Sequence, residues 1–293
     1  MIKKGIILAG GSGTRLYPMT SLISKQLINI YDKPMIYYPL TTLMLGGVRE
    51  IAIVSTPHDI GNYRKLLGDG REWGIDLSYI IQEEPRGLAD AFIVCKEFIG
   101  EDKVCLILGD NLFYGSMRIS EIFNSFEEGA LIFGYPVKDP QRFGVVEFDS
   151  NSKVIGIEEK PSEPKTNYAV PGLYLYDNQV VSFASELKPS KRGELEITDL
   201  NLTYLDRDEL KVKILNRGVS WLDTGTCDSL IDASSFVQSV EKRLSYKIGC
   251  PEEVALRKNF ISVDEFGQLI KKMPKCDYRN YLNIVSNEIR QLR

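Results

Sequence analysis

Short apolar runs alternate with amphipathic segments through the first half of the chain. Five runs are too short for helices, and continuous apolar stretches of this length are typical of strands buried on both faces of a sheet. We predict strands at Gly5–Ala9, Glu50–Ser55, Leu77–Ile81, Val104–Leu108 and Ala130–Tyr135. Between them, apolar residues recur at the i, i+3, i+4 and i+7 spacing of a helix, over 36–44, 88–95 and 119–126.

This alternation predicts an α/β fold with a doubly wound, mostly parallel, Rossmann-like sheet and helices on both faces. In such folds, ligands bind at the carboxyl ends of the strands. We expect the first helix to begin behind Pro34 and to stop at Gly46 and Gly47, because proline favours the first helical turn and glycine favours the end.

The pattern becomes richer in strands after Tyr135. The runs Gly144–Phe148 and Val154–Glu158 flank a turn at 149–152 and predict a hairpin. Further strands are predicted at Tyr168–Tyr176 and Lys211–Leu215, with helices near 178–187 and 197–205. We therefore expect a small β-rich insertion within the α/β unit.

Only helices are predicted from Cys227 onward. An apolar stripe with helical spacing runs from Leu230 to Leu244, Pro251 begins a second helix, and Ser262 with Glu265 forms a capping box. The expected organisation is a single α/β core over residues 1–226, followed by a helical extension over 227–293.

Composition narrows the class of protein without changing the fold. The 293 residues carry a formal net charge of −4, with 43% apolar and 26% charged residues, which are ordinary values for a globular protein. Apolar runs are shorter than the roughly 20 residues of a membrane helix. Mild acidity offers no electrostatic footprint for nucleic acid or anionic lipid. We expect a cytoplasmic enzyme with no nucleic-acid or membrane partner.

Cysteine and histidine usage excludes several chemistries. The five cysteines are scattered and contain no C-x-x-C pair, which favours reduced thiols over a disulfide framework or a zinc site. The single histidine, His58, lies in a turn-like segment. A Ser-His-Asp catalytic triad or a histidine-rich metal site is therefore not expected.

The strongest local signal is the glycine-rich segment Gly10-Gly11-Ser12-Gly13 directly after the first strand. Glycines let backbone N–H groups turn toward a phosphate chain, and Arg15 and Lys25 add cations. The alternative interpretation is that these glycines form only a tight turn between a strand and a helix, without binding phosphate. The dinucleotide fingerprint would need a third glycine where Leu16 stands, and the Walker sequence Gly-Lys-Ser/Thr is missing.

Two aspartates occupy strand-end positions. Asp110 follows the run 104–108 and Asp223 follows Trp221 and Leu222. Paired carboxylates completed by phosphate oxygens and water are typical Mg²⁺ ligands, whereas an isolated strand-end aspartate commonly serves as a turn or cap residue. The Asp-x-Asp at 206–208 lies in an alternating charge run and is expected to be a solvated turn.

Motifs along the whole chain, residues 1–293, resemble the sugar nucleotidyltransferase family, and within it the members that couple a thymidine nucleotide to glucose 1-phosphate. The first is LAGGSGTRLYP at 8–18, with Lys25 downstream. The others are Gln82–Ala89, Leu108–Asn111, Glu158–Pro161, Asn167–Asp177, Arg192–Asp199 and Trp221–Gly225.

The resemblance implies an activity: transfer of a deoxythymidylyl group from dTTP to α-D-glucose 1-phosphate, giving dTDP-glucose and pyrophosphate by Mg²⁺-assisted single displacement. It implies a homotetramer that supplies dTDP-rhamnose or another deoxysugar. It assigns the nucleotide to residues 1–135, the sugar phosphate to 136–226, and an oligomer interface with a possible regulatory site near Arg257 to 227–293. The attacking phosphate oxygen is already anionic, so no histidine base is needed.

The resemblance also implies residue roles. Arg15, Lys25 and Lys160 are the expected catalytic cations, and Asp110 and Asp223 the expected metal ligands. Nucleotide binding is expected at Leu8, Gly10, Gly11, Gly13, Thr14, Gln26, Gln82, Gly87 and Asp110. Sugar-phosphate binding is expected at Gly144, Glu159, Lys160, Val170, Tyr174 and Arg192. Three positions depart from the family pattern: Arg86 replaces a common aspartate, Asp90 a common glutamine and Phe143 a frequent tyrosine.

Three other functions remain as alternatives, one from the same class of enzyme and two from other classes of protein. A uridylyltransferase differs in substrate by one methyl group, which gives only about 1–3 kcal/mol of discrimination. A nicotinamide oxidoreductase would share the parallel sheet but needs the missing glycine. A non-catalytic binding subunit would be expected to have lost some of its phosphate-handling charges, yet Arg15, Lys25 and Lys160 are present.

Overall fold

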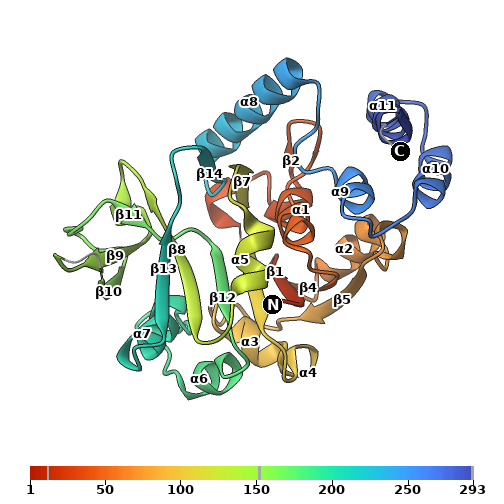
Figure 1. Cartoon of the computed structure of the whole chain (residues 1–293). Helices are drawn as coiled ribbons and strands as arrows, with labels where there is room; N and C mark the ends of the chain where they lie inside the picture. The colour runs from red at the N-terminus through yellow and green to blue at the C-terminus, as the bar shows by residue number, and fades with distance from the viewer. Residues whose placement is uncertain (12, 151–152, 292–293) are drawn as a thin grey trace.

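A mixed ten-stranded sheet forms the centre of the computed structural model, which describes residues 1–11, 13–150 and 153–291 (Figure 1). The strand order is β10-β9-β11-β8-β12-β6-β1-β4-β5, with β13 paired to β8. The strands are β1 (Lys4–Leu8), β4 (Glu50–Ser55), β5 (Asp76–Ile81), β6 (Val104–Leu108), β8 (Ala130–Pro136), β9 (Gly144–Phe148), β10 (Val154–Glu159), β11 (Tyr168–Ala169), β12 (Leu173–Tyr176) and β13 (Leu210–Ile214).

Two further sheets each consist of two antiparallel strands. They pair β7 (Asn111–Gly115) with β14 (Val219–Asp223), and β2 (Asn29–Ile30) with β3 (Lys33–Pro34). The α-helices are α1 (Tyr37–Gly46), α2 (Ile60–Leu67), α3 (Asp90–Val94), α4 (Lys96–Ile99), α5 (Ile119–Ser125), α6 (Val180–Glu186), α7 (Ile197–Asp206), α8 (Cys227–Leu244), α9 (Pro251–Arg257), α10 (Val263–Lys272) and α11 (Asp277–Gln291). Short 3₁₀ turns include η1 (Thr14–Leu16) and η2 (Lys25–Leu27).

The predicted parallel arrangement is confirmed in one half of the sheet, where β6, β1, β4 and β5 run parallel. Lys4 of β1 pairs with Glu50 on one side and with Val104 on the other, so the carboxyl ends of β1, β4 and β6 meet at one edge. Strand β12 runs antiparallel between β6 and β8 and joins the second half of the sheet to the first.

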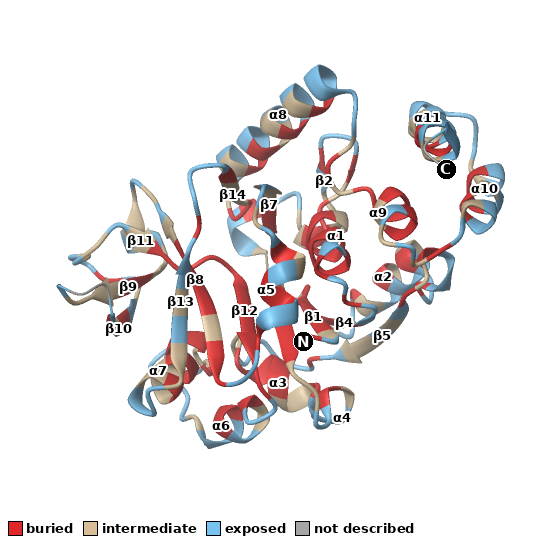
Figure 2. Ribbon diagram, viewed as in Figure 1, coloured by how far each residue is buried: buried red, intermediate tan, exposed pale blue. Residues whose placement is uncertain are grey.

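Helices cover both faces of this sheet because alternate side chains of the central strands point to opposite sides. Ile7 belongs to the same buried cluster as Leu40 of α1, whereas Ile6 belongs to a second cluster with Phe92 of α3 and Leu200 of α7. Figure 2 shows the central strands buried and the outward faces of the surrounding helices exposed. The continuous apolar runs in the sequence therefore correspond to strands buried on both faces.

Two sequence expectations differ from the structure in detail. Pro34 does not begin a helix: it lies in β3, opposite Asn29 of β2, and α1 begins at Tyr37. Gly47 ends that helix as expected, with φ of 96°. The run at 168–176 divides into β11 and β12 because Pro171 has no backbone N–H to donate to a ladder.

The extension after Cys227 is helical, as predicted. Thr226 caps α8, Pro251 begins α9, and the capping box between Ser262 and Glu265 is formed at α10. The predicted turn at 149–152 lies partly outside the described residues, which exclude 151 and 152. The five cysteines are free thiols. Within the described ranges, none of the helices combines the length and apolar character that a bilayer crossing requires.

Two helical glycines offer a test of this packing with opposite expected signs. A Cβ at Gly46 of α1 would lie 2.4 Å from the ring of Phe123, whereas a Cβ at Gly61 of α2 would meet nothing within 4 Å. We expect Gly46→Ala to lower the free energy of unfolding by about 1–3 kcal/mol through overpacking. Gly61→Ala should raise it by about 0.4–1 kcal/mol through helix propensity.

Urea unfolding of both variants measures these differences directly. A Gly46→Ala protein as stable as the parent would show that α1 and α5 are packed less closely than described.

Candidate active site

The glycine-rich segment follows β1 and lies against the end of β6. The backbone N–H of Gly109 donates to the carbonyl of Leu8 at 2.9 Å. A Cβ at Gly109 would lie 2.9 Å from that carbonyl and 2.8 Å from Cγ of Gln26, so only glycine permits this approach. The next residue, Asp110, is thereby brought beside the segment. Ser12 lies outside the described residues.

The two predicted strand-end aspartates come together although 113 positions separate them. Strand β14 pairs with β7 so that Asp223 is opposite Asn111. Thr224 then donates to the Asp110 carbonyl twice, from its backbone N–H at 3.1 Å and from its hydroxyl at 2.8 Å. These bonds fix the chain that carries Asp223 to the chain that carries Asp110.

The carboxylates of this pair experience opposite pKa shifts. Partial burial alone would raise the pKa of Asp110, but the ammonium of Lys25 and a hydrogen bond from Asn111 hold it below its ordinary value. Burial and the charge of Asp110 together raise the pKa of Asp223. The cations Lys25, Arg142 and Arg15 only partly offset that increase. Binding of a divalent cation to both carboxylates would therefore stabilise the charged form of Asp223.

Three cations surround the two aspartates. Lys25 contacts Asp110 directly. A Cβ at Gly225 would lie 3.4 Å from Nη1 of Arg15 and 3.1 Å from Oδ2 of Asp223, which places Arg15 beside the second aspartate. Arg142 was not anticipated from the sequence, where it is a lone arginine in a loop; its Nη2 lies 3.5 Å from Oδ2 of Asp223.

The donor set fits a hard divalent cation. Asp110 and Asp223 supply oxygen ligands, and Mg²⁺ characteristically takes one or two carboxylates together with substrate phosphate oxygens and water. Over the part of the chain that the structure describes, no group of three or more His, Cys, Asp or Glu side chains is arranged around a common point. A fully protein-bound metal site is therefore not found among those residues.

A second group of predicted residues lies at the start of β9 and the end of β10. Glu159 accepts a hydrogen bond from Thr198 at 2.7 Å, and Lys160 lies 3.2 Å from its other oxygen. The backbone of Gly144 approaches Glu159 closely, because a Cβ there would lie 3.3 Å from Oε2 of Glu159 and 4.0 Å from Cβ of Val170. Thr198 was not singled out from the sequence, since only the packing of α7 on β10 reveals its contact.

Tyr174 and Arg192 flank this group in different ways. Tyr174 is buried in β12, the strand beside β6, and burial together with the charges of Glu159 and Asp110 raises its pKa. Arg192 is exposed and forms a salt bridge with Glu196 at 2.8 Å. A phosphate would have to compete with the Glu196 carboxylate for Arg192. Binding of the sugar phosphate by Arg192 therefore stays a prediction.

The third group lies at the end of β5. Gln82 is buried, and its Nε2 donates to Asp90 at 2.8 Å and to the Gly87 carbonyl at 3.3 Å. Gly87 has φ of +106°, and a Cβ there would lie 2.4 Å from the Leu195 carbonyl, so glycine is required. A Cβ at Gly10 would lie 3.7 Å from Gln82 Oε1, which joins this group to the glycine-rich segment.

Gln26 is also buried beside that segment. Its Oε1 accepts from the hydroxyls of Ser24 and Tyr63, at 2.7 and 3.2 Å. Neither hydroxyl residue was anticipated from the sequence. The predicted residues Leu8, Gly11, Gly13 and Thr14 lie in β1 and the segment after it, where Gly13 has φ of 59°.

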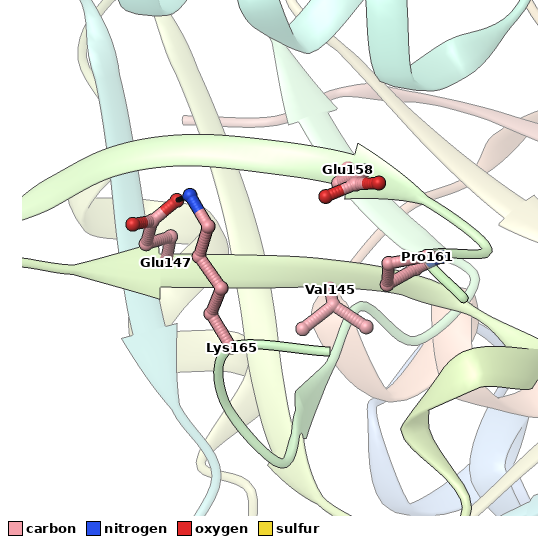
Figure 3. Close-up of a pocket in the computed structure, with 5 residues that line it drawn as sticks. All are labelled: Val145, Glu147, Glu158, Pro161 and Lys165. Carbon is pink, nitrogen blue, oxygen red and sulfur yellow. Dashed lines mark hydrogen bonds and ion pairs between the residues drawn. The ribbon is translucent and has the colours of Figure 1, made fainter. Parts of the chain in front are cut away.

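A hollow on the β9–β10 hairpin is distinct from these groups. It is lined by Val145, Glu147, Glu158, Pro161 and Lys165, with Lys165 paired to Glu147 at 2.8 Å (Figure 3). Its volume of about 10 Å³ is no more than one water molecule needs. The hollow therefore does not accommodate a sugar.

Comparisons with known proteins agree on one class of enzyme. A family model described as nucleotidyl transferase matches residues 4–240. A glucose-1-phosphate thymidylyltransferase of Neisseria meningitidis is 54% identical over 281 residues, covering 95% of this chain and 98% of its own. One from Mycobacterium tuberculosis is 52% identical, with 95% and 97% covered.

Solved structures show the same likeness. A Bacillus anthracis protein assigned as a glucose-1-phosphate thymidylyltransferase, in complex with a sucrose, is 43% identical with a TM-score of 0.75, covering 80% of this chain and 94% of that one. A UDP-glucose pyrophosphorylase complexed with UDP-glucose is 25% identical with a TM-score of 0.72, covering 82% and 100%.

Removing the two aspartate charges should change the stability of the metal-free protein in opposite directions. Asp223→Asn removes a carboxylate whose pKa the fold raises, and such a group destabilises the fold above its folded pKa but not below its unfolded pKa. We expect a gain of about 0.5–2 kcal/mol at pH 7. Asp110→Asn leaves Lys25 without its partner and should cost about 1–3 kcal/mol.

Urea unfolding in the presence of a chelator measures both effects. The gain from Asp223→Asn should shrink as the pH falls toward the ordinary carboxyl range. Equal changes in the two variants would contradict the charge balance derived for the pair.

Proposed function

This chain belongs to the nucleotidyl transferase family, and on that premise we propose that it transfers a deoxythymidylyl group from dTTP to α-D-glucose 1-phosphate. The products are dTDP-glucose and pyrophosphate. One observation supports the proposal most directly: in the sheet, β6, which Asp110 follows, lies between β5, which Gln82 follows, and β10, which ends at Glu159. In the proposal, the phosphates bind at the aspartate pair, the base binds on the Gln82 side and the sugar binds on the Glu159 side.

The reaction is a single displacement in which no protein nucleophile takes part. An oxygen of the sugar phosphate forms a bond to the α-phosphorus of dTTP, and the bond from that phosphorus to the bridging oxygen breaks as pyrophosphate leaves. The attacking oxygen is already anionic at pH 7. The protein's task is to align two mutually repelling anions and to neutralise the leaving group.

Each group of residues then has a separate task. Arg15 and Lys25 bind the triphosphate, and the glycine-rich segment supplies backbone donors. Enzymes of this family generally use a divalent metal; we propose Mg²⁺ held by Asp110 and Asp223, which would supply positive charge at the reacting phosphate. Lys160 and Arg192 bind the sugar phosphate.

Sugar hydroxyls are the proposed ligands of Glu159 and Tyr174. Thr198 fixes one carboxylate oxygen of Glu159 through a 2.7 Å hydrogen bond, so the side chain is oriented before substrate arrives. The backbone of Gly144 lies close to this carboxylate, since a Cβ there would come within 3.3 Å of it, and the backbone at Gly144 and Val170 is the proposed neighbour of the sugar ring.

The location, assembly state and pathway of the enzyme are also proposals. We infer a cytoplasmic homotetramer that acts at the first step of dTDP-rhamnose or other deoxysugar synthesis. Ile231 and Leu244 of α8 and Ile284 of α11 support an interface, because they are apolar and 47–63% exposed. Light scattering coupled to size exclusion determines the assembly state.

A regulatory nucleotide site is proposed at a separate cavity. Its volume is about 270 Å³, near the lower limit for ligand pockets, and its lining includes Leu45, Phe113, Met117 and Arg118. Arg257 is not among its lining residues; it pairs instead with Glu253. Titration with dTDP-sugars at fixed substrate tests this assignment through changes in turnover.

One assay tests the main proposal: pyrophosphate release with each of four triphosphates and several sugar 1-phosphates. We expect dTTP with glucose 1-phosphate to give the highest kcat/KM. Some use of UTP is expected because the methyl group adds only about 1–3 kcal/mol of discrimination. Preference for UTP would favour the uridylyltransferase alternative.

Both metal-ligating aspartates should be needed for turnover. Asp110→Asn and Asp223→Asn each remove one oxygen ligand, so we expect kcat to fall about 10²–10³-fold and the Mg²⁺ concentration for half-maximal activity to rise. Asp208→Asn is the matched control, since Asp208 is exposed, pairs with Lys153 at 2.9 Å and is assigned no metal. An unchanged metal response in both variants would defeat the assignment.

Lys160→Ala should separate the two substrates. We expect KM for glucose 1-phosphate to rise about tenfold or more while KM for dTTP changes little. Lys160 pairs with Glu159 after β10, which several strands separate from β1 and the glycine-rich segment. Lys165→Ala is the control, because Lys165 lies between β10 and β11, close to Lys160 in the sequence, and pairs with Glu147. An equal rise in both KM values would contradict the role given to Lys160.

A further inference from the structure

A buried acid–amide pair closes the carboxyl end of β5. Gln82 is 7% exposed and Asp90, the first residue of α3, is 1% exposed. Nε2 of Gln82 donates to Oδ2 of Asp90 at 2.8 Å. A carboxylate can only accept hydrogen bonds, so the amide nitrogen must face Asp90 and the amide oxygen must face away from it.

That oxygen faces the glycine-rich segment. A Cβ at Gly10 would lie 3.7 Å from Oε1 of Gln82, and the backbone N–H of Gln82 donates to the carbonyl of Ser55 at the end of β4. Gln82 thus presents an acceptor at the edge where the strands end. The Gly87 carbonyl, 3.3 Å from Nε2, further holds the nitrogen in the protein.

The second oxygen of Asp90 is not satisfied in the same way. Oδ1 is buried and accepts no hydrogen bond from the residues described, and the nearest cation is Nε of the exposed Arg86, at 3.8 Å. Burying a carboxylate oxygen without a donor is unfavourable. An aspartate that served only to begin α3 could be exposed and fully solvated. The burial of Asp90 therefore indicates that its Oδ2, which accepts from Gln82, has a function of its own.

We propose that Asp90 is a positioning residue for base selection. By fixing the Gln82 amide with its oxygen outward, it makes Gln82 an acceptor for the N3–H of thymine or uracil. The same oxygen would face the N3 lone pair of cytosine and repel it. The inference rests on the proposed function only in taking a pyrimidine nucleotide as the ligand, because the readout is nucleotide binding rather than turnover.

Asp90→Asn tests the inference because asparagine has nearly the same shape but can donate as well as accept. Only the longer bond to the Gly87 carbonyl, at 3.3 Å, then favours the original orientation of the Gln82 amide, and the flipped orientation becomes accessible. We expect the ratio of the Kd values for dCTP and dTTP, measured calorimetrically with Mg²⁺, to be well above ten in the parent and to fall about tenfold. The KM for glucose 1-phosphate should stay within twofold, since Asp90 lies at the base end.

A double-mutant cycle separates positioning from general damage. Gln82→Ala should lower the same ratio, and adding Asp90→Asn to Gln82→Ala should change it no further, because Asp90 acts through Gln82. Asp177→Asn is the matched control: Asp177 is also buried, and it accepts from Gly129 N–H and Tyr204 at 2.8 and 2.9 Å. It should change stability without changing the ratio.

The outcomes are distinct. A lower melting temperature for Asp90→Asn with an unchanged Kd ratio overturns the inference and leaves Asp90 as a helix-start residue. An unchanged ratio in Gln82→Ala overturns it even where Asp90→Asn fails to fold. Selective dTTP binding by a parent protein that releases no pyrophosphate would remove the proposed function while the ratio still decides the role of Asp90.

Discussion

Repulsion between the carboxylates of Asp110 and Asp223 is the constraint around which the site is arranged. Two like charges in a partly buried region raise each other's pKa and destabilise the fold unless cations compensate them. Lys25 compensates Asp110 by direct contact, whereas Asp223 has Arg15 and Arg142 at longer range and keeps a raised pKa. The imbalance is what makes the region suitable for a divalent ion and for phosphates that bring their own counter-cations.

The backbone enforces this unfavourable approach. Gly109 lets β6 run against β1, and the two hydrogen bonds from Thr224 to the Asp110 carbonyl hold the end of β14 in place. Asn111 adds a further link, since its Oδ1 accepts from the Trp221 indole at 2.6 Å and from the Gly172 N–H at 3.0 Å. Satisfied polar groups and a buried core therefore offset the repulsion, as is common where function and stability conflict.

Much of the architecture was predictable because it depends on local periodicity. Five short apolar runs became strands at nearly the predicted positions, and the alternation of Ile6 and Ile7 between two cores follows from the strand period of two. Pro34 failed as a helix start because pairing of β3 with β2 outweighed its preference. The positions of Asp110 and Asp223 in the sequence favoured strand ends, but their proximity depends on β14 pairing with β7.

Residues that act through neighbours were harder to find from sequence. Arg142 belongs to none of the motifs, and Thr198 lies within one but has no role assigned from it. Each becomes informative only through a contact with a residue distant in the sequence, Asp223 and Glu159 respectively. The base end follows a different physical rule from the phosphate end. Phosphates are bound by net charge, which tolerates movement of flexible cations, whereas a base edge is distinguished by which atom of one amide faces it. A fixed carboxylate behind that amide is therefore more consequential than another exposed charge, even though it adds nothing to phosphate binding.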